Sequence, residues 1–447
     1  MPEIPATSPL RPALTVPRWL LVPGATLFAV SVAALLLLGF TAGFDPYDLG
    51  VYLLGGDAWR HGLPVYDQTV SSQWGTGYFT YPPVTLLVFA PLSVLPHGTV
   101  HAVMAVAGVL SLIAVVWLVL RSLGCRSSAG TTGLALGLAG AALWVQPVYD
   151  SLQQGQINLM LMALIVADLA LDGRRRWPTG ILIGFAAAAK ITPGIFIVYL
   201  LLTRRFRAAA TAAATWAALT AAGFIVAPGD SAQFWLHGTF FNSSRVASPL
   251  TADSVFNQSI HGVAIRVLGS GWGEPLWLVV AAVVVTAGLW AAVVAHRTFA
   301  PMAGGLVCAV TGLLVSPLTW HEHWVWIVPV VVALGIFAWQ FRDRAPVLAG
   351  ALPCLAALPF LMWPLPQNEQ GDVVPASILS PAHHLWEDEG SRNPLVGLAG
   401  AAYVMVGLAL LAVVVLAIRH SRRTSGAASP APLPAEAQPR ATSESMP

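Results

Sequence analysis

The sequence predicts an all-α integral membrane protein that crosses the bilayer many times. Hydrophobic residues make up 56% of the 447 residues and charged residues 9%, with a mean hydropathy of +0.72, whereas soluble domains carry about 25% charged residues. Many apolar runs approach the roughly 20 residues that a spanning helix needs. Arginines cluster in short segments between these runs, as expected of loops that stay in the cytoplasm.

The arginine clusters predict the topology. Arg11 and Arg18 assign the N-terminal segment, residues 1–18, to the cytoplasm, and the first helix then delivers residues 44–82 to the outer side as the first outer loop. Further along, the chain is predicted to return to the cytoplasmic side wherever arginines occur, at 121–126, 174–176, 204–207, 297, 342–344 and 419–423. The membrane domain is therefore expected at 19–418, with about 10–13 membrane segments. A full span needs about 20 residues, and a re-entrant segment is shorter. Both termini are cytoplasmic, and residues 419–447 are predicted to be a disordered tail.

The chain's only lysine, Lys190, lies in the apolar run GILIGFAAAAKITPGIFIVYLLL, while the other 21 of its 22 basic residues are arginines. Only 27 residues separate the arginine clusters on either side, so this run is predicted to enter the membrane and return as a hairpin of two short helices. An ammonium group in such surroundings is costly unless an anion meets it. Lys190 therefore either snorkels to a lipid headgroup or binds a negatively charged ligand.

The first outer loop carries two candidate aspartates. Its portion YDLGVYLLGGDAWR has apolar residues at helical spacing and is predicted to lie at the membrane interface as an amphipathic helix. Asp45 and Asp48 stand at the start of this helix, where a carboxylate is often a cap. Asp48 precedes an apolar segment, and burial there would raise its basicity and suit it to act as a general base.

Further polar groups collect at other predicted outer loops. Gln156 and Asn158, in GQIN, open a membrane helix, where amides are either caps or hydrogen-bond partners of a sugar. The segment SPLTWHEHWVW carries Glu322 between His321 and His323. A metal site is disfavoured there, because two histidines that are two residues apart do not share a helix face.

Composition also excludes other classes of site. The cysteines, Cys125, Cys308 and Cys354, are widely spaced and suggest neither a disulfide framework nor a zinc site. The net charge is only +2 and the chain has no basic stripe interleaved with exposed aromatic residues. Nucleic acid is therefore not an expected partner, whereas membrane lipids are.

In chain order, the motifs resemble glycosyltransferase family 87 of the GT-C superfamily, in particular its polyprenyl-phosphomannose-dependent α-mannosyltransferases. They are an aspartate before L-x-V-Y, then FTYPP, GQIN, K-x-T-P, FNQS and SP-x-x-W ending in HW, between about Phe44 and Trp326. Each motif is weak alone, but six in this order are specific. The resemblance implies a GT-C type helical bundle in the plasma membrane with its active site facing outside.

The resemblance also implies a reaction. Mannose would move from polyprenyl-phosphate-mannose to a mannosylated lipid or lipoglycan acceptor, with inversion, to form an α-1,2-mannoside. Asp48 would be the general base, with Asp45 as the second choice, and Lys190 would bind the donor phosphate together with His323 or His321. The sugar- or acceptor-binding residues would be Tyr81, Gln156, Asn158, Asn257, Gln258, Trp320 and Glu322. No metal or cofactor is expected, because no nucleotide diphosphate leaves.

One position departs from the family. Its members place two adjacent histidines before the tryptophan, where this chain has Glu322 and His323. His323 keeps its position beside the tryptophan and is therefore preferred at the donor phosphate. Two other functions stay open: a polyprenyl-phosphoarabinose-dependent arabinofuranosyltransferase, and a transporter or flippase of a lipid-linked sugar. FTYPP, FNQS and SP-x-x-W favour the mannosyl reaction, and the lack of an inverted repeat of short helices disfavours a transporter.

Overall fold

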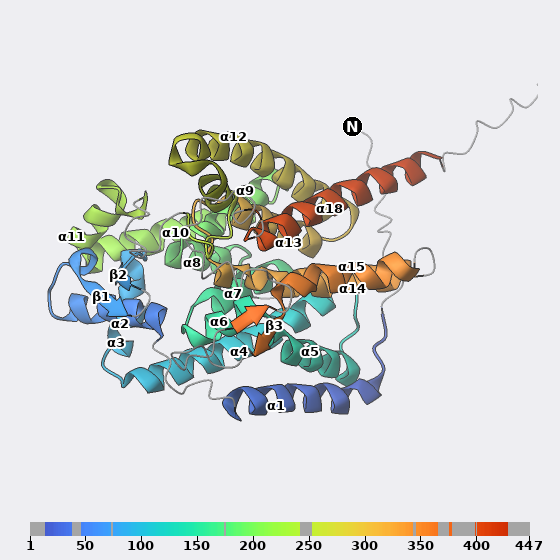
Figure 1. Cartoon of the computed structure of the whole chain (residues 1–447), viewed down its shortest axis with the longest axis horizontal. Helices are drawn as coiled ribbons and strands as arrows, with labels where there is room; N and C mark the ends of the chain where they lie inside the picture. The colour runs from blue at the N-terminus through green and yellow to red at the C-terminus, as the bar shows by residue number, and fades with distance from the viewer. Residues whose placement is uncertain are drawn as a thin grey trace, which may run out of the picture.

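Most helices of the protein lie side by side along its long axis (Figure 1). The computed structural model describes residues 14–37, 46–72, 75–173, 176–241, 253–342, 346–364, 375–377, 398 and 400–427. At one end of the bundle, on the left of Figure 1, lie α2 (Tyr47–Arg60), α11 (Pro228–Ser231) and a hairpin of β1 (Thr69–Ser72) and β2 (Gly75–Tyr78). The opposite end of the bundle holds the N-terminal end of helix α1 (Leu21–Leu37) and the C-terminal end of helix α18 (Ala402–Ala427).

The remaining described elements complete the bundle. The helices are α3 (Leu86–Leu92), α4 (His97–Ser122), α5 (Ala129–Ala142), α6 (Gln146–Gln153), α7 (Asn158–Ala170), α8 (Ile181–Ala189), α9 (Ile195–Leu202), α10 (Phe206–Val226), α12 (Ile260–Thr298), α13 (Pro301–Val315), α14 (Ile327–Phe341) and α15 (Pro346–Ala357). Strands β1 and β2 are antiparallel, with Thr69 opposite Tyr78. A second short pair joins β3 (Met362–Pro364) to β4 (Pro375–Ser377).

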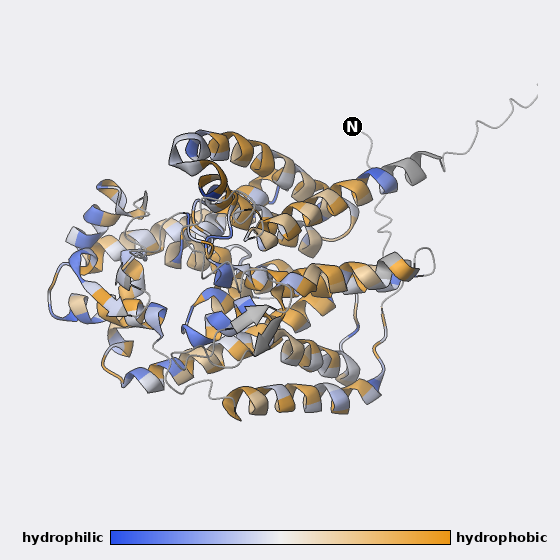
Figure 2. Ribbon diagram, viewed as in Figure 1, coloured by the Kyte–Doolittle hydropathy of each residue, from blue (hydrophilic) through white to orange (hydrophobic). Residues whose placement is uncertain are grey.

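Six helices of the described residues are long and apolar enough to cross a membrane, and a seventh span forms if α6 and α7, bent by 118°, count together. Figure 2 shows apolar residues along most of the length of these helices, with polar residues concentrated around α6 and at the end that carries α2 and α11. The multi-pass all-α prediction is thus confirmed. Full-length spans are fewer than the membrane segments expected from the sequence, because several apolar runs form helices of only 10–17 residues.

Helix α2 packs closely against α3 because Gly56 has no side chain. A Cβ atom at this position would lie 2.5 Å from the main-chain carbon of Phe89, a separation at which the two helices would have to move apart. The ring of Phe89 stacks on Tyr52 with centroids 4.6 Å apart. This contact fixes the helix that carries Asp48 at its first turn.

The run around Lys190 forms the predicted hairpin of two short helices, α8 and α9. At its base, the Asp168 carboxylate accepts hydrogen bonds from the main-chain N–H groups of Gly180 and Ile183 at 2.9 and 3.0 Å. Asp172 and Arg205 close the other side of the base, with N and O atoms 2.7 Å apart. Lys190 ends α8 in an extended conformation, with φ −150° and ψ 134°. The hairpin therefore begins and ends on one side of the bundle and carries Lys190 near its tip.

Candidate active site

A hydrogen-bond chain connects the first turns of α2 to the start of α7. The Tyr52 hydroxyl, one turn after Asp48, donates to Oε1 of Gln156 at 2.8 Å. The Tyr52 oxygen lies 3.0 Å from the Tyr81 hydroxyl, which then acts as the donor. The Gln156 amide is hydrogen bonded to Asp48 and lies 3.4 Å from Oε1 of Glu322. GQIN and FTYPP thus meet at the aspartate that the sequence proposes as the base.

Lys190 reaches the same place from its hairpin. Its Nζ atom donates to Oδ1 of Asn158 at 3.0 Å and lies 2.9 Å from Nε2 of His323. It also lies 5.7 Å from the ring centroid of Tyr81, within cation–π range. Lys190 is therefore held by polar partners inside the protein, and the snorkelling interpretation does not describe its position.

Glu322 is buried beside this lysine network. His321 stands between two carboxylates, with Nε2 2.8 Å from Oδ2 of Asp150 and Nδ1 3.2 Å from Oε2 of Glu322. The main-chain oxygen of Glu322 accepts from Ser151 at 3.1 Å and from Asn158 at 3.4 Å. His321 therefore contacts Asp150 and Glu322, whereas His323 contacts Lys190.

Burial is the largest influence on the acidity of Asp48. Burial and the neighbouring Glu322 carboxylate together raise the pKa of the Asp48 carboxyl to about 7, against the opposing effects of the Gln156 hydrogen bond and the Lys190 and His321 charges. A carboxyl with a pKa near 7 has the basicity that suits a general base near neutral pH. The site therefore combines such a group with a fixed cation.

A small, mostly apolar cavity of about 60 Å³ lies beside this cation. Its polar lining comes from Lys190, Asn158, His323, Thr192, Ser316 and Thr319. Apolar side chains of α7, α9 and α13 line the rest, among them Leu161, Met162, Ile165, Ile195, Phe196 and Leu313. A positive group beside apolar side chains matches the character of a ligand that joins an anionic head to a hydrocarbon tail.

The FNQS segment lies behind the site as a structural support. The Asn257 amide donates to the Pro317 oxygen at 3.1 Å and accepts from the Thr319 N–H at 3.1 Å, and Asn257 pairs with Trp320 in an isolated bridge. The Gln258 amide donates to the oxygens of Val255 and Gly400, both at 2.6 Å. These contacts hold the segment before His321, and sugar binding by Asn257, Gln258 and Trp320 stays a prediction.

Sequence reasoning gave Tyr52 no role, and it noted Asp150 only as a polar residue of the same outer loop as GQIN. Tyr52 follows Asp48 by four residues, which is the spacing of neighbours on one helix face, so its role was readable from the pattern. The pairing of Asp150 with His321 gave no such signal, because the two residues are 171 positions apart. Asp45, the second choice as base, lies outside the described residues.

The sequence profile of glycosyltransferase family 87 matches residues 79–317, more than half of the chain. The chain is 32% identical over 374 residues to a polyprenol-phosphate-mannose-dependent α-(1-2)-phosphatidylinositol mannoside mannosyltransferase of Mycobacterium tuberculosis, covering 78% of this chain and 85% of the relative. It is 32% identical over 421 residues to a protein of the same description from Mycolicibacterium smegmatis, covering 89% and 90%.

A further relative from Mycobacterium tuberculosis, a polyprenol-phosphate-mannose-dependent α-(1-2)-phosphatidylinositol pentamannoside mannosyltransferase, is 33% identical over 317 residues, 69% of this chain and 71% of its own length. These extents of identity, together with the profile match, confirm the resemblance seen in the motifs. The chain belongs to glycosyltransferase family 87 and is a membrane glycosyltransferase.

Proposed function

We propose that this protein transfers mannose from polyprenyl-phosphate-mannose to a mannosylated phosphatidylinositol acceptor and forms an α-1,2-mannoside with inversion. The observation that carries the proposal is the position of Lys190, which lines a mostly apolar cavity and acts electrostatically on Asp48. The names of the relatives support the donor, the acceptor class and the linkage.

The proposed donor matches the character of the residues around this cavity in both of its parts. The polyprenyl chain lies among the apolar side chains of α7, α9 and α13, and the phosphate meets Lys190 and the imidazole of His323. The positive charge stabilises the polyprenyl phosphate as it leaves, and this group needs no metal to neutralise it. In this proposal the polyprenyl chain and the phosphate of the donor thus contact different side chains of one site.

Asp48 acts on the acceptor in this proposal. Its carboxylate takes the proton from the acceptor hydroxyl while that oxygen attacks the anomeric carbon from the face opposite the phosphate, so the β-linked donor gives an α-linked product. Gln156 holds the carboxylate, and Tyr52 holds Gln156. The network therefore orients the base before the acceptor arrives.

The active site faces the outside of the membrane in this proposal. The support is the arginine distribution, which assigns the clusters at 174–176 and 204–207 to the cytoplasm, together with the base of the hairpin at Asp172 and Arg205. Lys190, near the hairpin tip, then lies toward the outer leaflet. Labelling of single cysteines introduced on either side by a membrane-impermeant reagent tests this orientation.

Purified protein in detergent, incubated with radiolabelled polyprenyl-phosphate-mannose and mannosylated phosphatidylinositol, is expected to yield a longer product that α-1,2-mannosidase trims. A parallel reaction with polyprenyl-phosphoarabinose separates the arabinosyl alternative, and transfer in detergent excludes a pure flippase because no bilayer remains to be crossed. Transfer from the arabinosyl donor alone, or from neither donor, contradicts the proposal.

A further inference from the structure

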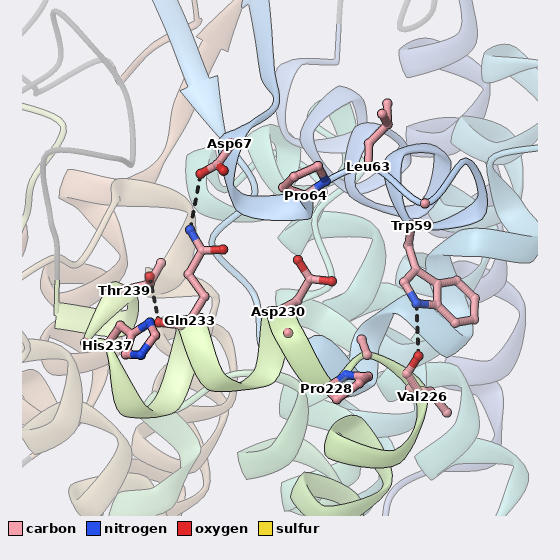
Figure 3. Close-up of a pocket in the computed structure, with 14 residues that line it drawn as sticks. Trp59, Leu63, Pro64, Asp67, Val226, Pro228, Asp230, Gln233, His237 and Thr239 are labelled. Carbon is pink, nitrogen blue, oxygen red and sulfur yellow. Dashed lines mark hydrogen bonds between the residues drawn. The ribbon is translucent and has the colours of Figure 1, made fainter.

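A second cleft, of about 930 Å³, opens at the end of the bundle that carries α2 and α11. Figure 3 shows it between the C-terminal end of α2 with the segment that follows, and the segment from the end of α10 through α11 to Thr239. None of the residues placed in the hydrogen-bond chain around Asp48 and Lys190 lines this cleft. The cleft is therefore a site distinct from the candidate active site.

The polar groups of the cleft are suited to hydroxyl groups. Oδ1 of Asp67 accepts from the Gln233 amide at 3.2 Å, and Oδ1 of Asp230 accepts from the Val65 N–H at 3.0 Å. A carboxylate has about four acceptor positions, so each of these aspartates has capacity for a ligand. The lining residues of the cleft include neither Lys nor Arg, which makes it unsuited to phosphate and other anions.

Contacts on both walls hold the cleft in shape. On one side the indole N–H of Trp59 donates to the Val226 oxygen at 3.2 Å, as Figure 3 shows. Beneath it, the buried ring of Tyr66 stacks on Phe234 with centroids 5.5 Å apart. Gln233 belongs to a π-helical turn, Ala232–Leu236, a form that is rare and frequent at functional sites.

We propose that this cleft is a second, non-catalytic saccharide site that binds neutral hexose units of the acceptor glycan. Carboxylate and amide acceptors beside an indole are the groups that neutral sugars use, since sugars offer many hydroxyl donors and apolar ring faces. The identity of the sugar as mannose rests on the proposed function, while the preference for a neutral polyol rests on the cleft alone.

Helix α2 relates the two sites in space. Asp48 lies in its first turn and Trp59 in its last, eleven residues apart, which is roughly 16 Å along the axis at 1.5 Å per residue. A glycan bound in the cleft is thus held too far from Asp48 for the same sugar unit to react. The cleft therefore acts on acceptors that carry a saccharide chain and is not engaged by the shortest ones.

Direct binding tests the cleft independently of transfer. Saturation-transfer difference NMR with an α-linked mannotriose is expected to report contact with purified protein and with Asp48→Asn. Asp67→Ala and Gln233→Ala are expected to weaken this binding by roughly three- to tenfold each, the range of one lost hydrogen bond. Asp57→Ala is the control, because Asp57 is an exposed carboxylate of α2 that pairs with Arg60 and does not line the cleft.

Equal mannotriose binding by the cleft variants and the control would overturn the proposal. So would binding that disappears with a chelator, since the aspartates would then hold a cation. In transfer assays the cleft variants are expected to raise KM for an acceptor with several mannose units and to leave KM for the shortest acceptor unchanged. Equal changes of KM for both acceptors would also overturn the proposal. If the wild-type protein transfers nothing, the proposed function fails, yet the NMR result still decides whether the cleft binds saccharide.

Discussion

Nζ of Lys190 lies 2.9 Å from Nε2 of His323. An ammonium group only donates hydrogen bonds, so His323 accepts through Nε2 and carries its own proton on Nδ1. A second N–H of Lys190 goes to Asn158 at 3.0 Å. The lysine therefore keeps one N–H for a ligand, while its two protein partners fix the direction in which that N–H points.

Lys190→Ala is expected to lower kcat/KM for the polyprenyl-phosphate donor by about 10- to 100-fold, because a charge-assisted hydrogen bond to the leaving phosphate is lost. Initial rates at varied donor concentration measure the change. Arg207→Ala is the control, since it removes an exposed positive charge in the first turn of α10 that makes no contact with the network around Lys190. An unchanged donor dependence in Lys190→Ala would remove the lysine from the phosphate site.

Asp48→Asn is expected to lower the transfer rate by about 10²- to 10⁴-fold, the usual contribution of a general base. The amide is nearly isosteric and can still bond to Gln156, so the melting temperature in detergent should change little. Asp57→Asn, on the exposed side of the same helix, serves as the control. Near-normal turnover of Asp48→Asn would show that another group removes the acceptor proton.

The transfer rate is expected to depend on pH through Asp48. Since burial and Glu322 raise the pKa of Asp48 to about 7, its carboxyl is largely protonated below that pH and cannot accept a proton. The rate should therefore fall about tenfold for each pH unit below about 7 and level off above it. A pH–rate profile with an acid limb near 4, the ordinary range of an aspartate, would contradict this electrostatic account.

Glu322→Gln should move that acid limb to lower pH. The Glu322 carboxylate raises the pKa of Asp48, and a neutral amide removes this repulsion while it can still accept from Gln156. The shift of the limb in the variant relative to wild type is the measurement. A fall in rate without any shift would assign Glu322 a purely structural role.

Gly56→Ala is expected to destabilise the fold by about 1–3 kcal/mol, the cost of overpacking, because the added Cβ would meet the main chain of Phe89. Thermal unfolding in detergent checks this. Gly98→Ala is the matched control, since an added Cβ there meets nothing within 4 Å. Equal melting temperatures for the two variants would mean that α2 and α3 separate at no cost.

Hydrophobic length and arginine placement were sufficient to predict the all-α bundle and the hairpin around Lys190. Both depend on properties that are local in sequence: the run length, and the cost of an ammonium group in an apolar run. The β1–β2 hairpin was not predicted, because Thr69–Ser72 and Gly75–Tyr78 are short and lie in a segment interpreted only as a polar loop.

Contacts between residues far apart in the sequence could not be predicted. Nothing near Asp150 indicates His321 as its partner, and nothing near Asp67 indicates Gln233. The FNQS amides are a further example: the family resemblance predicts sugar contacts for Asn257 and Gln258, and the structure adds that both side chains bond to main-chain groups. A motif gives the residue type, and only the packing shows which partner it has.

The short hairpin of α8 and α9 also bears on how the protein is assembled in the membrane. Its helices have 9 and 8 residues, well short of the roughly 20 that insert independently into lipid, and Lys190 between them would be costly against acyl chains. The hairpin contacts α7, α10 and α13. The walls around the lysine include α10 and α13, which are synthesised after it, so the hairpin is expected to reach its final depth only once these later helices have inserted.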